Sequence, residues 1–81
     1  MTLTIHLFAR ARELTSADSV VIELAPASTV ADVKCALADH FPALASLLTV
    51  SAIAVNHDFA EDSHVIAPSD ELAVIPPVSG G

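Results

Sequence analysis

The spacing of apolar residues changes twice along this chain, and that change constrains its fold more than any other feature. Apolar and polar residues alternate over residues 3–7 and again over 20–24, and a period of two is typical of β-strands. Over residues 30–41 the apolar positions recur every three or four, which predicts one amphipathic helix. Strand-like patterns return at 51–55 and 71–75. The chain is therefore expected to combine a sheet with one main helix.

Local chemistry sets the limits of the predicted helix. Thr29 suits the N-cap position, and Asp32 stands where both a capping box and the helix dipole favour a carboxylate. Pro42 lacks a backbone N–H and restricts the residue before it, so the helix is expected to end there. The apolar stripe between these limits consists of Val30, Val33, Leu37 and Phe41.

The remaining segments are shorter and give weaker patterns. Residues 9–14 lose the alternation, so we expect an irregular loop or a helical turn there. Residues 59–67 are ambiguous, with a short strand expected at Val65 and Ile66. A second short turn of helix is expected to carry Leu44, Leu47 and Leu48. Asn, Asp, Ser and Pro predict turns at residues 56–58 and 68–70.

This order of elements predicts an α+β fold, with a mixed β-sheet packed against one main helix. If the first and last strands pair in parallel at the centre of the sheet, the fold is a β-grasp. A chain of 81 residues can form one compact domain and is too short for two. We therefore expect a single domain over residues 1–75, followed by an extended tail over residues 76–81 that ends in a flexible Gly-Gly.

Charge and cysteine content exclude several classes of function. Three basic residues face ten acidic ones, and the formal net charge is −7. So few cations cannot neutralise a phosphate backbone or an anionic lipid surface, so neither nucleic acid nor a membrane is an expected partner. The single cysteine, Cys35, cannot form an intramolecular disulfide and is expected to face outward from the helix. We expect a cytoplasmic protein.

The glycines are distributed in an unusual way, because the only two in the chain are its last two residues, Gly80 and Gly81. A Gly-Gly end has no side chains, so it can enter a narrow active-site channel. Pro76 and Pro77 stiffen the chain where it leaves the last strand. A tail of this kind presents the terminal carboxylate for activation, for example by adenylation and attack by a sulfur nucleophile. The alternative is an inert, floppy end.

The chain as a whole resembles the small, sulfur-carrying subunits of molybdopterin synthase, which are ubiquitin-like β-grasp proteins. The resemblance covers almost the whole length, and its most specific part is the C-terminal hexapeptide, because related sulfur carriers usually share only the final Gly-Gly. The matching segments are Leu7-Phe8-Ala9-Arg10-Ala11-Arg12-Glu13-Leu14, Ser28-Thr29-Val30-Ala31-Asp32-Val33, Ala54-Val55-Asn56 and Asp70-Glu71-Leu72-Ala73-Val74-Ile75-Pro76-Pro77-Val78-Ser79-Gly80-Gly81.

The resemblance implies a cycle centred on Gly81. An ATP-dependent activating enzyme adenylates the Gly81 carboxylate, and a sulfur donor converts it to a thiocarboxylate. The tail then enters the large subunit of molybdopterin synthase and transfers sulfur to cyclic pyranopterin monophosphate. The implied assembly is a heterotetramer. Catalytic side chains are expected on the large subunit, so this chain is not expected to be an enzyme on its own or to bind a cofactor.

The resemblance also implies a partner surface. Phe8 and Ile75 stand on the side of their strands opposite to Leu7 and Val74, and an exposed apolar sheet face is often a binding surface. Ile75 replaces an aromatic residue found in some family members. The alternative for the two phenylalanines is that they complete the core. The expected partner-binding residues are Phe8, Arg12, Phe59, Ile75, Pro76, Pro77, Val78 and Ser79.

Other chemistry and other functions remain as alternatives. Four histidines are scattered without metal-ligand spacing, so no metal site is expected, and Asp58, Glu61 and Asp62 are interpreted as a solvated acidic face.

A second hypothesis is a sulfur carrier for thiamine, cysteine or thiolated tRNA. A third is a ubiquitin-like modifier that is joined to lysines through Gly81. A fourth is an interaction module with an inert tail.

Overall fold

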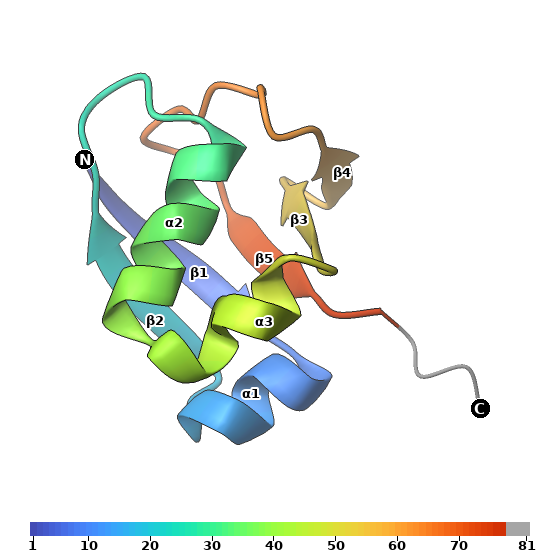
Figure 1. Ribbon diagram of the computed structural model, residues 1–81. Helices are drawn as coiled ribbons and strands as arrows, with labels where there is room; N and C mark the ends of the chain where they lie inside the picture. The colour runs from blue at the N-terminus through green and yellow to red at the C-terminus, as the bar shows by residue number, and fades with distance from the viewer. Residues whose placement is uncertain (78–81) are drawn as a thin grey trace.

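The computed structural model describes residues 1–77, and its elements follow the order expected from the pattern (Figure 1). Residues 78–81, which include the predicted tail residues Val78, Ser79, Gly80 and Gly81, lie outside the described part. The elements are β1 (Thr2–Leu7), α1 (Ala9–Thr15), β2 (Ser19–Glu23), α2 (Val30–His40), the 3-10 turn η1 (Pro42–Leu44), α3 (Ala45–Leu48), β3 (Ala52–Val55), β4 (Asp58–Ala60) and β5 (Leu72–Ile75).

The five strands form one mixed sheet in the order β2-β1-β5-β3-β4. The first and last strands pair in parallel, with Ile5 opposite Leu72 and Leu7 opposite Val74, and every other pair is antiparallel. Because β5 lies between β1 and β3, the last strand occupies the centre of the sheet. This is the β-grasp arrangement that the order of elements predicts, so that prediction is confirmed.

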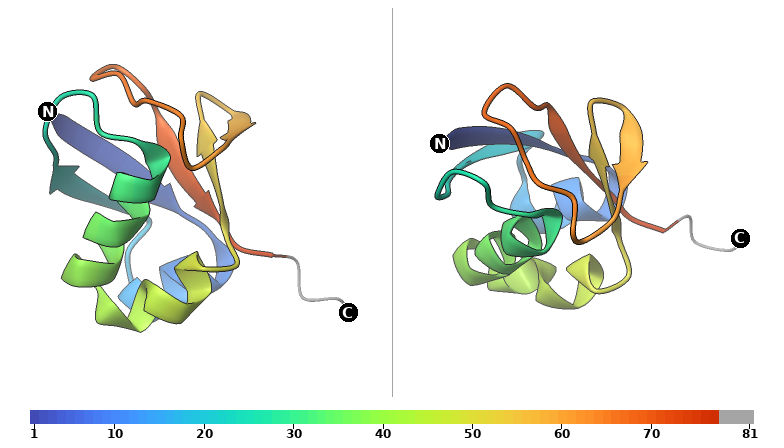
Figure 2. Two further views of the ribbon diagram at one scale, coloured as in Figure 1. Left: turned by 45° about the horizontal axis from the view of Figure 1, so that its top comes forward. Right: turned by 90° about the horizontal axis from the view of Figure 1, so that it is seen from above.

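The two faces of the sheet have different neighbours. Helices α2 and α3 lie on one face, which we call the inner face, and within residues 1–77 the opposite, outer face has no helix over it (Figure 2). Alternate residues of β1 and β5 point inward and are completely or almost completely buried. The centre of the core consists of Leu3, Ile5, Leu7, Val30, Val33, Leu37, Leu72 and Val74.

Helix α2 begins and ends where its sequence signals predict. The Asp32 carboxylate accepts a hydrogen bond from the Thr29 backbone N–H at 2.9 Å, and the Thr29 hydroxyl oxygen accepts one from the Asp32 N–H at 3.4 Å, which is a complete capping box. At the other end Phe41 donates its N–H to the Leu37 carbonyl at 2.8 Å, and Pro42 starts a separate 3-10 turn. The predicted second helical turn is present as η1 and α3.

Of two ambiguous segments, one is resolved and one needs correction. For residues 9–14 the helical alternative holds and the irregular loop does not, because they belong to a seven-residue helix, α1, in which Ala11 is fully buried. The expected short strand at Val65 and Ile66 is reduced to a single bridge between Val65 and Thr29, and the fourth strand is β4 at Asp58–Ala60. The cause is tertiary, because Ile66 donates its N–H to the Ser28 carbonyl at 2.8 Å and packs into the core beside α2.

The hairpin between β3 and β4 turns through only two residues. Asn56 and His57 both have positive φ values, 52° and 73°, as type I′ turns require. This hairpin places His57 and Phe59 beside the start of β5, because β3 pairs with both strands. No helix within residues 1–77 is long and apolar enough to cross a membrane.

Candidate functional site

The outer face of the sheet contains an apolar groove of about 280 Å³. Its floor is formed by two alanines that stand opposite each other on neighbouring strands, Ala54 of β3 and Ala73 of β5. Phe8, Phe59 and Ile75 contribute larger side chains around this floor. The groove exists because small residues alternate with large ones on a face that no helix of residues 1–77 covers.

The structure brings three predicted partner-binding residues into this groove. Phe8 follows β1 with an extended backbone and is 50% exposed, and Phe59 on β4 is 76% exposed. Ile75 is half-buried at the end of β5. The alternative that the two phenylalanines complete the core is therefore wrong for this structure, since both rings are exposed on the outer face.

Arg12 lies in a different place from the groove. It lines a separate hollow of about 700 Å³ together with Ala9, Arg10, Glu13, Leu47, Pro76 and Pro77, in which two arginines stand against one glutamate. Its Nη1 atom is 3.5 Å from Oδ1 of Asp18, an exposed ion pair of the kind that adds little stability. The predicted partner residues thus divide into an apolar groove and a basic hollow beside the first tail residues.

The first two tail residues are described and the other four are not. Pro76 is half-buried and Pro77 is exposed directly after β5. The roles expected for Val78, Ser79, Gly80 and Gly81 concern residues outside the described range, so they stay predictions.

A cluster of three titratable residues, absent from the sequence-based list, lies at the polar end of the groove. His6 Nε2 is 3.3 Å from Glu71 Oε1, and His57 Nε2 is 3.5 Å from Glu71 Oε2. His57 and Glu71 line the groove itself. The sequence alone indicated that His6 points away from the core, because it alternates with the apolar residues of β1. To find the cluster one also needs the β1–β5 register, in which His6 stands opposite Ala73.

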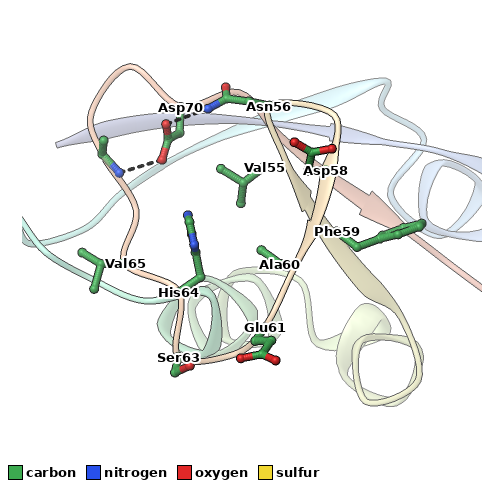
Figure 3. A pocket seen from close by; sticks show the side chains of 11 residues that line it. Val55, Asn56, Asp58, Phe59, Ala60, Glu61, Ser63, His64, Val65 and Asp70 are labelled. Atoms are coloured by element: carbon green, nitrogen blue, oxygen red, sulfur yellow. Dashed lines mark hydrogen bonds between the residues drawn. The ribbon is translucent and has the colours of Figure 1, made fainter.

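Asn56 fixes the backbone of Glu71. Its backbone N–H donates to the Glu71 carbonyl at 2.8 Å, and its side-chain Oδ1 accepts from the Glu71 N–H at 2.9 Å. Its Nδ2 donates to Oδ1 of Asp70 at 2.9 Å (Figure 3). Glu71 is therefore held at a defined position at the start of β5.

Asp70 is the residue whose pKa is most clearly set by its surroundings. Its carboxylate accepts a hydrogen bond from the Ala67 N–H at 2.8 Å in addition to the one from Asn56. These two bonds, with the Ala67 bond the larger contribution, lower the pKa of Asp70 below its ordinary value of 3.8. Figure 3 shows both bonds beside a hollow toward which His64 points and from which the Phe59 ring is turned away.

The other candidate chemical groups are dispersed. Within residues 1–77 no group of three or more His, Cys, Asp or Glu side chains has a geometry that could hold a metal ion. Cys35 is exposed, as its position on the helix predicts. The predicted acidic face, Asp58 in β4 with Glu61 and Asp62 after it, is exposed, and Asp62 forms an ion pair with Lys34 at 3.0 Å.

Comparison with known proteins identifies relatives over nearly the whole chain. The ThiS family matches residues 5–81. The molybdopterin synthase sulfur carrier subunit of Arabidopsis thaliana is 37% identical over 79 residues, which cover 98% of this chain and 82% of the relative. The subunit of the same name from Dictyostelium discoideum is 40% identical over 80 residues, with coverages of 95% and 93%.

A solved structure gives the same picture of the fold. The crystal structure of SAMP1, a small archaeal modifier protein of Haloferax volcanii, has a TM-score of 0.88 to this chain at 29% identity and covers all of both chains. This chain belongs to the ThiS family, and its relatives there include molybdopterin synthase sulfur carrier subunits.

Proposed function

We propose that this chain is the sulfur-carrier subunit of a molybdopterin synthase and acts in molybdenum cofactor biosynthesis in the cytoplasm. The observation that carries the proposal is its 37% and 40% identity to two sulfur carrier subunits of that enzyme. The family match extends to residue 81, so it includes the Gly-Gly end. The chain is thus proposed to work as a subunit, with the catalytic side chains on the large subunit.

The proposed chemistry takes place at the C-terminal carboxylate. A carboxylate oxygen is a poor leaving group, so an activating enzyme first transfers AMP from ATP to Gly81 and releases pyrophosphate. A sulfur donor then displaces AMP and leaves a thiocarboxylate. In the large subunit this sulfur passes to cyclic pyranopterin monophosphate, and two charged carriers are consumed for each dithiolene. Gly80 and Gly81 are proposed to give the tail access to the channel, because glycine has no side chain.

The geometry of the described residues supports a docking role for the outer face. Strand β5 contributes Ala73 and Ile75 to the groove and continues directly into Pro76. A protein that binds in the groove therefore lies close to the point where the tail begins. The basic hollow at Arg12 adjoins the same two prolines. We propose that the large subunit contacts both surfaces, with Phe8, Phe59 and Ile75 as the apolar contacts and Arg12 as a polar one.

A second candidate function has a specific observation in its favour. The TM-score of 0.88 and 29% identity to SAMP1 favour a protein modifier that is joined to lysines through Gly81. A modifier forms covalent conjugates that disappear when Gly81 is deleted, whereas a dedicated sulfur carrier forms none. Immunoblots of cell extracts that express a tagged full chain or the deletion variant distinguish the two.

Complementation tests the main proposal. The full chain, the Gly81 deletion and Gly81→Ala are each expressed with the matching large subunit in a bacterium that lacks its own synthase, and nitrate reductase activity is measured. We expect activity from the full chain, none from the deletion, and reduced activity from Gly81→Ala because its methyl group widens the tail. Mass spectrometry of the purified full chain is expected to show the replacement of one oxygen by sulfur.

The outcomes separate the hypotheses. Activity that survives deletion of Gly81 would show an inert tail and contradict the proposal. A thiocarboxylate without restored nitrate reductase would indicate a sulfur carrier for another pathway, such as thiamine or tRNA thiolation.

A further inference from the structure

The apolar groove has one charged wall, and that wall is the carboxylate of Glu71. The floor and the other walls are alanine, leucine, isoleucine and phenylalanine side chains, with His57 beside Glu71. The Glu71 side chain is 55% exposed, so a docked protein can reach it. A carboxylate that loses water on docking costs free energy unless a positive group replaces the water.

Glu71 is positioned more firmly than an ordinary surface glutamate. Its backbone N–H and C=O are both hydrogen-bonded to Asn56, at 2.9 and 2.8 Å. Its two carboxylate oxygens lie near different imidazoles, from His6 on β1 and from His57 in the β3–β4 turn. Two separate parts of the fold, β1 and the β3–β4 turn, thus place side chains around one carboxylate at the edge of the groove. A group that is already in place loses little side-chain entropy when a partner binds it.

We propose that Glu71 is the specificity-determining residue of the groove and receives a lysine or arginine side chain from the docked protein. This inference rests on the proposed function, in which that protein is the large subunit. The occupant is therefore a protein surface with an apolar side chain over Ala54 and Ala73 and a cationic side chain beside it. A cationic side chain on the partner fits this chain, whose formal net charge is −7, because opposite charges favour association.

A second copy of this chain does not fit these requirements. Both copies would bring a net charge of −7 to the contact, and like charges oppose association. The three lysines and arginines of the sequence, Arg10, Arg12 and Lys34, belong to α1 and α2 and not to the sheet. Sedimentation of the isolated chain is expected to show a monomer, and a dimer that dissociates on substitution of Glu71 would contradict the inference.

Binding of the full chain to the large subunit of the same genome tests the inference. Calorimetry measures the dissociation constant for the wild type, Glu71→Gln and the control Asp39→Asn, which removes one charge from the exposed side of α2. Glu71→Gln is expected to weaken binding about tenfold at pH 8, the effect of one charge-assisted hydrogen bond at a half-exposed site, and Asp39→Asn is expected to leave it unchanged. Circular dichroism checks that both variants fold.

NMR of the free chain provides an independent readout of the geometry. Glu71→Gln is expected to shift the ring signals of His6 and His57, whose Nε2 atoms lie 3.3 and 3.5 Å from the Glu71 carboxylate, and to leave those of His40 unchanged.

Two further results would overturn the inference. Equal affinities of Glu71→Gln and Asp39→Asn contradict it and leave the proposed function intact. Failure of the wild-type chain to bind the large subunit contradicts the proposed function, and the inference falls with it.

Discussion

At the scale of single residues, Asn56 connects the hairpin turn to the start of the central strand. It takes a positive φ of 52°, which asparagine tolerates better than most residues. Its side chain and backbone together make hydrogen bonds to Asp70 and to both backbone groups of Glu71. The chain thus builds without glycine a turn that usually contains it, and the same asparagine positions the polar end of the groove.

Asp70 gives a prediction at this scale. Asp70→Ala removes the acceptor for both the Ala67 N–H and the Asn56 amide, so we expect a loss of about 1–2 kcal/mol in the free energy of unfolding at pH 7. Urea unfolding followed by circular dichroism measures this loss. Asp58→Ala, which removes an exposed carboxylate from the same region, is expected to change stability by less than about 0.5 kcal/mol.

The pH dependence of this effect has a definite sign. The pKa of Asp70 is lowered in the folded protein, so folding favours its ionised form. Its contribution to stability is therefore present above its ordinary pKa of 3.8 and is lost as the pH falls through the lowered folded value. The difference in the free energy of unfolding between the wild type and Asp70→Ala is expected to shrink in this acid range. A difference that grows on acidification would contradict the assignment.

At the scale of elements, α2 depends on its capping box. The reciprocal bonds between Thr29 and Asp32 satisfy N–H groups that have no partner within the helix. Thr29→Ala and Asp32→Ala are each expected to lower the free energy of unfolding by about 1 kcal/mol, and the double variant by less than the sum because the two residues share their bonds. Thermal or urea unfolding of the wild type, the two single variants and the double variant gives the four free energies of unfolding that this double-mutant cycle needs.

A matched control comes from the other end of the same helix. Asp39 is exposed in the last turn of α2, where the helix dipole disfavours a negative charge. Asp39→Ala is therefore expected to leave stability unchanged or to raise it slightly. If Asp32→Ala and Asp39→Ala lowered the free energy of unfolding equally, the stability of α2 would not depend on the capping box.

How well each element could be predicted depends on whether its causes are local. Helix α2 has its cap, its stripe and its terminating Pro42 within its own segment, so its limits were predicted correctly. Helix α1 has only seven residues and no side-chain cap, so its pattern was too short to distinguish it from a loop. The prediction of a strand at Val65 and Ile66 was wrong because Ile66 donates its N–H to the carbonyl of Ser28, which is far away in sequence.

At the scale of the whole molecule, the decisive feature is the difference between the two faces of one sheet. The parity of residues along a strand predicted that Phe8 and Ile75 would lie away from the core, and the groove contains both. The cluster of His6, His57 and Glu71 could not be predicted in the same way. It depends on the parallel register of strands that are separated by most of the chain. Local alternation along one strand predicts which face of the sheet a residue lies on. A site built from several strands can be predicted only when the pairing register of those strands is known.

This asymmetry predicts that stability and partner binding can be changed separately. Phe59 is 76% exposed on β4, so Phe59→Ser is expected to change the free energy of unfolding by less than about 0.5 kcal/mol. If the groove is the docking surface, the same substitution removes an aromatic contact and weakens binding to the large subunit about tenfold or more. Calorimetric titration and urea unfolding of one preparation measure the two effects.

The opposite edge of the sheet supplies the control for this last prediction. Val21 is 62% exposed on β2, and its neighbour Ile22 is buried, so Val21 faces outward as Phe59 does. The two strands are the two edges of the sheet, with three strands between them. Val21→Ser is therefore expected to leave binding unchanged. If both substitutions weaken binding equally, the partner covers the whole outer face; if neither does, docking occurs elsewhere, and the basic hollow at Arg12 becomes the surface to test.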